Sequence, residues 1–213
     1  MRFFRGSAVQ TRVYSLRQWV KFVRRNKQAS NKPCDAASSH FATRKNYEYC
    51  LSMLEFRNAI ATDAVHCFEI EAASYQGDEA ATLEKISKRI ELYPDGFLIL
   101  EIDGAVVGFI NSGCAHDVKM SDEEFKELVG HDPHAPNVVI MSVVVDPTQQ
   151  GKGLSRALME EFVLRMKRMN KVTVHLMCNE HHVPLYEKFG YSYLRPSASE
   201  HAGMAWHEMS MTL

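Results

Sequence analysis

The chain has 213 residues, of which 46% are hydrophobic and 24% are charged, with a formal net charge of −1. This composition is typical of a folded globular protein that is long enough for one domain with a full core. The longest apolar stretches are too short to span a bilayer, the near-zero charge gives no support for nucleic-acid binding, and five scattered cysteines without CxxC spacing argue against a disulfide framework.

The N-terminal segment is strongly basic. Residues 1–34 contain nine Lys or Arg and no Asp or Glu, and arginines alternate there with aromatic and aliphatic residues. The segment can therefore form a basic amphipathic helix, as mitochondrial transit peptides do, and Arg12-Val13-Tyr14-Ser15 is similar to a matrix-protease site. We expect residues 1–40 to be a mitochondrial targeting segment and linker, and a cytoplasmic protein with a basic tail is the alternative.

From about residue 47 the pattern alternates between strands and helices. A strand is predicted over Tyr49–Arg57, followed by a helix that Thr62 or Asp63 caps and that runs through residues 66–75. Asp78 is expected to cap a second helix, on which apolar residues repeat at spacings of three and four. Pro94-Asp95-Gly96 ends this helix.

A β-hairpin is predicted next, because residues 97–102 and 105–110 flank Asp103-Gly104, a dipeptide that favours a type I′ turn. Residues 120–129 indicate a short acidic helix. Residues 138–145 are almost all apolar and β-branched, which is typical of a strand that is buried on both faces. Later elements are an amphipathic helix that begins near Gly151, a strand at 171–177, a short helix at 183–189, and strands at 191–194 and 204–212.

The most informative motif is a strand, then Gln150-Gly151-Lys152-Gly153-Leu154-Ser155, then a helix. Glycines at a strand-to-helix turn let backbone N–H groups point at a ligand, and the helix N-terminus adds about half a positive charge. This arrangement can bind a pyrophosphate without a metal, and Lys152 and Arg156 can add charge at its rim. The motif is neither a GxGxxG fingerprint nor a Walker loop.

The loop resembles the acetyl-CoA loop of the GNAT acetyltransferases, Arg/Gln-x-x-Gly-x-Gly/Ala, with Gln150, Gly153 and Ser155 at the fixed places. Leu176-Met177-Cys178 and the stretch 183–191 (VPLYEKFGY) resemble, within that superfamily, the arylalkylamine N-acetyltransferases. The resemblance covers residues 47–213. It implies one α/β domain with the GNAT fold, a mixed central β-sheet of six to seven strands flanked by about four helices.

The resemblance also implies roles for single residues. Tyr186 would protonate the departing thiolate, which suits a phenol because its pKa near 10 keeps it protonated at neutral pH; a core aromatic is the alternative. The pantetheine arm of acetyl-CoA would pair with the backbone of Val143, Val144 and Val145. The pyrophosphate would lie on Gln150, Gly151, Lys152, Gly153, Leu154, Ser155 and Arg156.

The amine must lose a proton before it can attack, because an alkylammonium has no lone pair. Vertebrate members of the resembled family use a His-x-His pair on the fourth strand, but Val139 and Met141 stand at the matching places here. Glu79 is the candidate replacement, since insect relatives use a glutamate in a comparable Asp-Glu pair. Alternatively, Asp78 is only a helix cap and Glu79 an ordinary first-turn acid.

The expected substrate is a small-molecule amine of the arylalkylamine class, because an aromatic-lined pocket favours a cation with an apolar body. A polyamine or protein-lysine acetyltransferase and a degenerate acetyl-CoA-binding protein are the alternatives. The ten histidines lack metal-ligand spacing, so no metal site is expected. The resemblance implies that the amine pocket is lined by Tyr75, Ile140, Met141, Met177 and Trp206, each of which could equally be a core residue.

Overall fold

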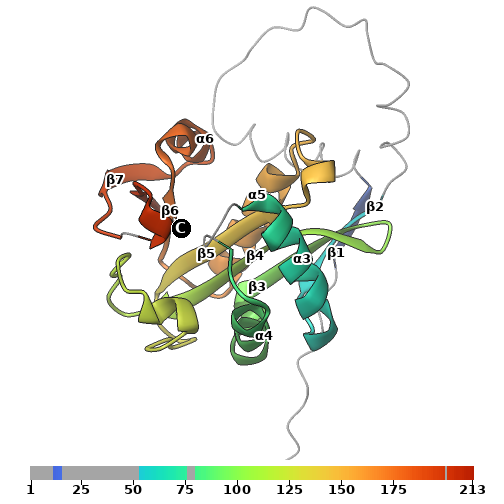
Figure 1. Ribbon diagram of the computed structural model, residues 1–213, viewed down its shortest axis with the longest axis horizontal. Helices are drawn as coiled ribbons and strands as arrows, with labels where there is room; N and C mark the ends of the chain where they lie inside the picture. Colours follow the sequence, from blue (N-terminus) through green and yellow to red (C-terminus); the bar gives the residue numbers. More distant parts are fainter. Residues whose placement is uncertain (1–11, 16–52, 76–79, 200) are drawn as a thin grey trace, which may run out of the picture.

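The computed structural model describes residues 12–15, 53–75, 80–199 and 201–213 (Figure 1). Asp78 and Glu79 therefore lie outside the described residues. The strands are β1 (Arg12–Ser15), β2 (Met53–Asn58), β3 (Phe97–Ile102), β4 (Ala105–Ala115), β5 (Asn137–Val145), β6 (Thr173–Cys178), β7 (Ser192–Pro196) and β8 (His207–Thr212). The α-helices are α3 (Ala64–Ser74), α4 (Leu83–Leu92), α5 (Leu154–Arg168) and α6 (Val183–Lys188).

All eight strands form one sheet in the order β1-β2-β3-β4-β5-β6-β8-β7. The β5–β6 pair is parallel and the other pairs are antiparallel, so the sheet is mixed. Residues 53–212 supply seven of these strands, as the sequence predicted, and the four α-helices of the described residues agree with the expected number.

The eighth strand comes from the basic N-terminal segment. Arg12–Ser15 pairs with residues 53–56 of β2, so the expectation of a helix is wrong for these four residues. The physical reason is that β2 would otherwise be an edge strand, whose unpaired backbone N–H and C=O groups favour the addition of another strand. Mitochondrial targeting stays a prediction.

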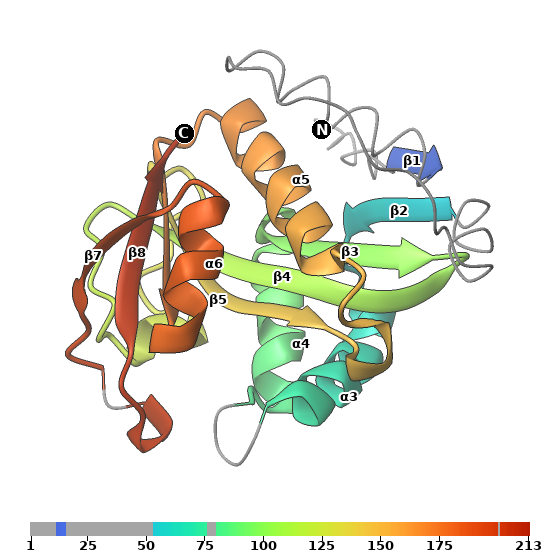
Figure 2. The ribbon, with the colours of Figure 1, turned by 90° about the horizontal axis from the view of Figure 1, so that it is seen from above.

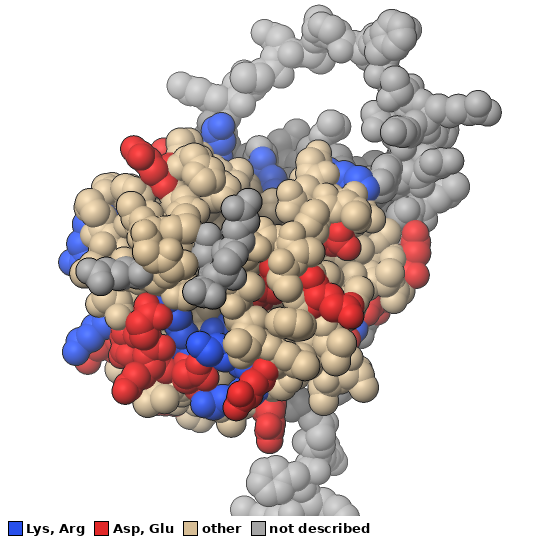
Figure 3. All heavy atoms as spheres, viewed as in Figure 1, with Lys and Arg blue, Asp and Glu red and all other residues tan. Residues whose placement is uncertain are grey.

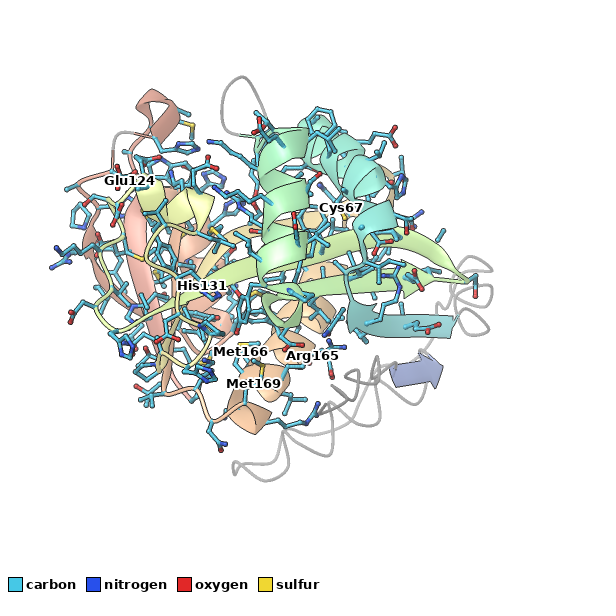
Figure 4. All side chains as sticks on the ribbon, turned by 90° about the horizontal axis from the view of Figure 1, so that it is seen from below. Cys67, Glu124, His131, Arg165, Met166 and Met169 are labelled. Atoms are coloured by element: carbon cyan, nitrogen blue, oxygen red, sulfur yellow. The ribbon has the colours of Figure 1, made fainter. Side chains whose placement is uncertain are left out.

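The helices cover both faces of the sheet. Figure 2 shows α5 on one face and α3 with α4 on the other. The α5 face holds a large apolar core, which includes Leu154, Leu158, Phe162 and Met166, the residues that repeat every four positions along the helix. The opposite face has its own core around Cys67 and Ile86, and Figure 4 shows Cys67 on the α3 side and Met166 on the α5 side.

The hairpin prediction is confirmed, because Asp103 and Gly104 have φ of 53° and 81°, as a type I′ turn requires. The predicted cap at Asp78 is wrong. Helix α4 begins at Leu83, and the hydroxyl of Thr82 accepts a hydrogen bond from the Lys85 N–H at 3.3 Å, which makes Thr82 the N-cap.

Two further boundaries differ from the sequence-based predictions. Helix α5 begins at Leu154, and not near Gly151, because Gly151 and Gly153 adopt left-handed φ values of 75° and 79° that a helix cannot contain. The acidic segment 120–129 forms only a short 3-10 turn, Glu124–Glu127, which ends at Leu128 with a φ of 59°. No helix in the described ranges combines the length and the apolar character that a membrane crossing needs.

Candidate active site

A cleft opens where β5 and β6 separate. The two strands pair only over Asn137–Val139 and Thr173–His175, and both then continue to the same edge of the sheet (Figures 1 and 2). The cleft between them has a volume of about 710 Å³. Its walls come from β5, β6, α3, α4, α6 and the loop before α5, so it gathers residues from almost the whole domain.

The loop before α5 forms one end of the cleft. Gly151 and Gly153 line it, and a Cβ atom added to either glycine would meet no atom within 4 Å. The left-handed backbone at both positions is the conformation that glycine adopts without strain. The loop leads into the N-terminus of a 15-residue helix, whose first N–H groups have no partner within the helix. An anion can therefore approach this backbone closely.

The two basic residues of the loop region are engaged elsewhere. The Lys152 ammonium donates to Gln149 Oε1 at 2.7 Å, and Arg156 pairs with Glu160 at 2.8 Å on the first turns of α5. Neither lines the cleft, whereas Gln150, Gly151, Gly153, Leu154 and Ser155 do. The two side-chain cations that the sequence placed at the rim of the phosphate site are thus not part of the cleft lining.

The carbonyl groups of Val143 and Val145, on β5, accept hydrogen bonds from other residues that line the cleft. The carbonyl of Val145 accepts from Gln150 Nε2 at 3.1 Å, and the carbonyl of Val143 accepts from the Tyr75 hydroxyl at 3.5 Å. Val144 packs on the other side, in the core beneath α3. Among the described residues this part of β5 pairs with β4 on one side and with no strand on the other, so an extended ligand arm can add there by backbone hydrogen bonding.

Tyr186 lies on α6 at the wall of the cleft, beside Cys178. Its ring makes edge-on contacts with Phe189 and Tyr191, at centroid distances of 6.1 and 5.9 Å. Burial, with a smaller contribution from Cys178, holds the pKa of Tyr186 well above its usual range. The phenol is consequently protonated at neutral pH and can only donate a proton.

Away from the loop, the lining combines apolar and aromatic residues with charged ones. The charged residues of the described lining are Lys85, Arg89, Lys119, Lys126, Glu71 and Asp122. Two of the cations are paired, Lys85 with Glu127 and Lys126 with Glu123. Figure 3 shows such mixed charges gathered on this face of the molecule.

All five predicted pocket residues line the cleft: Tyr75, Ile140, Met141, Met177 and Trp206.

A β-bulge in β5 sets the direction of the residues at the centre of the cleft. Asn111 of β4 faces Ser142 and Ser112 faces Ile140, so Met141 has no partner in the register. In a regular strand Ile140 and Ser142 would point to the same face. The extra residue reverses this: Ile140 packs into the α5 core, whereas Ser142 turns toward α3 and donates to Glu71 Oε1 at 3.0 Å.

The Glu71–Ser142 pair was missed by the sequence reasoning. Glu71 lies within the helix stretch FEIE, where an acid at an inward position is the one signal that could have marked it. Val139, at one of the places where the resembled family has histidine, packs instead with Ala115, Met120 and Phe125. Glu79 lies outside the described residues, and its role as base stays a prediction.

Comparison with known families matches residues 57–191 to the acetyltransferase (GNAT) family. The chain belongs to this family. It is similar to serotonin N-acetyltransferase from Mesocricetus auratus, with 28% identity over 78% of this chain and 80% of that protein. The serotonin N-acetyltransferase from Macaca mulatta is 27% identical over 78% of this chain and 81% of its own length.

Solved structures share the fold at lower identity. The loading GNATL domain of CurA from Lyngbya majuscula has a TM-score of 0.67 at 16% identity, over 75% of this chain and 97% of that one. The GNAT-like decarboxylase GphF, solved with isobutyryl-CoA, has a TM-score of 0.61 at 14% identity, over 74% and 98% of the two chains. The yncA protein of Salmonella typhimurium, solved with its cofactor acetyl-CoA, has a TM-score of 0.55 at 20% identity, over 75% and 94%.

The family and the site agree on the co-substrate. The protein is an N-acetyltransferase that uses acetyl-CoA, and the open glycine loop, the helix N-terminus and the exposed edge of β5 suit its pyrophosphate and pantetheine parts. Within the described ranges, no three His, Cys, Asp or Glu side chains are grouped so that they could hold a metal ion.

Proposed function

We propose that the protein transfers the acetyl group of acetyl-CoA to the primary amine of an arylalkylamine. The observation that carries this proposal is that apolar and aromatic side chains line the cleft, among them Tyr75, Phe125, Trp206, Met141 and Met177. An aromatic ring on the substrate gains burial there, and its ammonium can approach an aromatic face. The similarity to serotonin N-acetyltransferases supports the same class.

We infer direct attack of the amine on the thioester. The one cysteine among the described lining residues is Cys178, and burial raises the pKa of its thiol to about 11. A thiol with this pKa is almost entirely protonated at neutral pH and is a poor nucleophile, so an acyl-cysteine intermediate is disfavoured. Tyr186 donates the proton that the departing thiolate needs, and the neutral amine supplies the electron pair for the new C–N bond.

A polyamine is a weaker candidate on electrostatic grounds. A polycation needs several carboxylates along its length, whereas the described lining contains four Lys or Arg and two Asp or Glu residues. Like charges in a partly buried cleft oppose the binding of a second and third ammonium group. We therefore expect one amine attached to an apolar body.

The test is an amine panel with acetyl-CoA. Thiol release is measured for tryptamine, phenethylamine, spermidine and a lysine-containing peptide at one concentration. We expect the two arylalkylamines to be turned over at least about tenfold more efficiently than spermidine, since about 1.4 kcal/mol of differential binding gives a factor of ten. Preference for spermidine or the peptide would contradict the substrate class. No release of thiol above background with any of the amines would contradict acetyl transfer.

Trp206 offers a more specific test of the pocket. Its indole N–H donates to the His201 carbonyl at 2.9 Å, so the ring is held in place at the wall of the cleft. Trp206→Ala should raise KM for tryptamine about tenfold, with a smaller effect on a short alkylamine that does not reach the ring. Trp206→Phe is the control, because it keeps an aromatic surface. An equal loss for both amines would show that the ring serves only the fold.

A further inference from the structure

Glu71 is an almost fully buried carboxyl group at the wall of the cleft, with 1% of its surface exposed. One oxygen, Oε1, accepts two hydrogen bonds at 3.0 Å, from the backbone N–H of Ala81 and from the Ser142 hydroxyl. The other oxygen, Oε2, is buried and has no hydrogen-bond partner among the described residues. A buried polar atom without a partner is costly, so its retention in a cleft points to a role.

The cation whose charge acts on Glu71 does not contact the carboxylate directly. Arg89 on α4 attracts the carboxylate, but its guanidinium donates to the Lys126 carbonyl at 2.9 Å and to Asn111 Oδ1 at 3.3 Å. Burial is the largest influence on Glu71 and raises its pKa above the ordinary value, against the opposing effects of the Ala81 N–H, Arg89 and Ser142. A carboxylate in this environment is a stronger proton acceptor than one in water.

Ser142 connects this carboxyl group to the open cleft. Because its O–H donates to Glu71, the lone pairs of its oxygen stay available to accept a hydrogen bond from the cleft side. The bulge at Met141 gives Ser142 this orientation, and Ser142 lies on the part of β5 beyond Val139, with which β6 does not pair. Glu71 and Ser142 both line the cleft, so the hydroxyl can link the buried carboxylate to an amine that binds there.

We propose that Glu71 takes the proton from the incoming amine, and that the Ser142 hydroxyl relays it. The inference rests on the proposed amine acetylation. The ammonium, directly or through a water molecule, gives a proton to Ser142 Oγ as the Ser142 hydroxyl proton moves to the Glu71 carboxylate. The neutral amine then attacks the thioester carbon and the C–S bond breaks. Tyr186 protonates the thiolate, and the second amine proton restores the phenol.

Glu71→Gln is the variant that tests the proposal, because the amide oxygen can still accept from Ala81 and Ser142 while the basic group is lost. We expect single-turnover acetylation of tryptamine at pH 7 to fall about 10²-fold or more, with KM for acetyl-CoA unchanged. The defect should shrink as the pH approaches the amine pKa near 10, where the substrate arrives deprotonated. Ser142→Ala should lower the rate at least about tenfold with the same pH dependence.

Glu161→Gln is the matched control. Glu161 is also buried, with 3% of its surface exposed, but it lies on α5 and pairs with Arg165 away from the cleft lining. A loss of stability without a pH-dependent rate defect is expected for this variant. Glu79→Gln is measured in parallel as the rival acceptor. A rate defect that Glu79→Gln shows and Glu71→Gln lacks would overturn the proposal.

A measurement on the folded protein without substrate keeps the proposal testable if turnover is lost in every variant. A carboxyl group whose pKa is higher in the folded than in the unfolded state adds to the free energy of unfolding while it is protonated. This contribution is lost as the pH rises from the pKa in the unfolded chain, about 4.3, through the pKa in the folded protein. The Tm of wild type should therefore fall relative to Glu71→Gln over this range. A constant Tm difference would overturn the proposal, whereas a wild-type chain that acetylates no amine would overturn the proposed function as well.

Discussion

Replacing Tyr186 with Phe is expected to lower the single-turnover rate by about 10²–10⁴-fold, the usual scale for loss of a general acid. The ring would keep its edge-on contacts with Phe189 and Tyr191, so the fold and the affinity for acetyl-CoA should change little. Only the proton donor is removed, and the thiolate must then leave unprotonated or wait for water. Rapid-quench kinetics with saturating acetyl-CoA is the measurement, because slow product release would mask the defect in steady-state turnover.

Tyr191→Phe is the control for this prediction. The Tyr191 hydroxyl is buried without a partner among the described residues, and its ring lies 5.9 Å from that of Tyr186. The two variants therefore remove the same atom from neighbouring tyrosines, of which only Tyr186 lines the cleft. We expect Tyr191→Phe to keep the wild-type rate. Equal rates for wild type and both variants would show that Tyr186 contributes packing alone.

The sequence predicted most of the fold because its periodic patterns are local. The spacing of Leu154, Leu158, Phe162 and Met166 follows the turn of one helix, and all four residues are buried as expected. The Asp103-Gly104 turn is also local, since both residues need a positive φ that the dipeptide itself favours. Helix ends were less predictable: the Asp78 cap failed because Thr82 offered its hydroxyl closer to the apolar stripe of α4.

The site could be predicted only in part. The glycine loop is a contiguous motif, and the five pocket residues, read from a family resemblance, do line the cleft. The bulge at Met141 leaves no mark in the apolar run 137–145, yet it decides that Ser142 points toward Glu71 and Ile140 points away. The Glu71–Ser142 bond joins residues 71 positions apart, and no local pattern encodes such a contact.

This difference changes how the missing histidines are interpreted. With apolar Val139 and Met141 in their places, the sequence alone favours either Glu79 as a replacement base or a degenerate site. The structure adds a third possibility, a carboxyl group on the opposite side of β5 that a bulge connects to the cleft. Ala81, which donates to the same carboxyl oxygen, directly precedes Thr82, the N-cap of α4, so Glu71 also holds the chain that enters this helix.

Gly153→Glu should weaken acetyl-CoA binding by about tenfold or more, which corresponds to about 1.4 kcal/mol. Gly153 directly precedes α5, and a Cβ there would meet no protein atom within 4 Å, so the new side chain would extend into the space that the pyrophosphate needs. Its carboxylate would also oppose the phosphates and occupy the positive end of the helix dipole. Isothermal titration of the folded variant with coenzyme A measures the effect.

The substitution also introduces backbone strain, because Gly153 has a φ of 79°, and a matched control is needed to separate strain from lost binding. Gly104→Glu supplies it: Gly104 has a φ of 81° and equally open surroundings, but it lies in the β3–β4 turn and does not line the cleft. Both variants should lose similar stability, about 1–2 kcal/mol for a left-handed residue with a side chain. If Gly104→Glu weakened binding as much as Gly153→Glu, strain would explain the loss. Full affinity for coenzyme A in Gly153→Glu would show that the pyrophosphate does not bind at this loop.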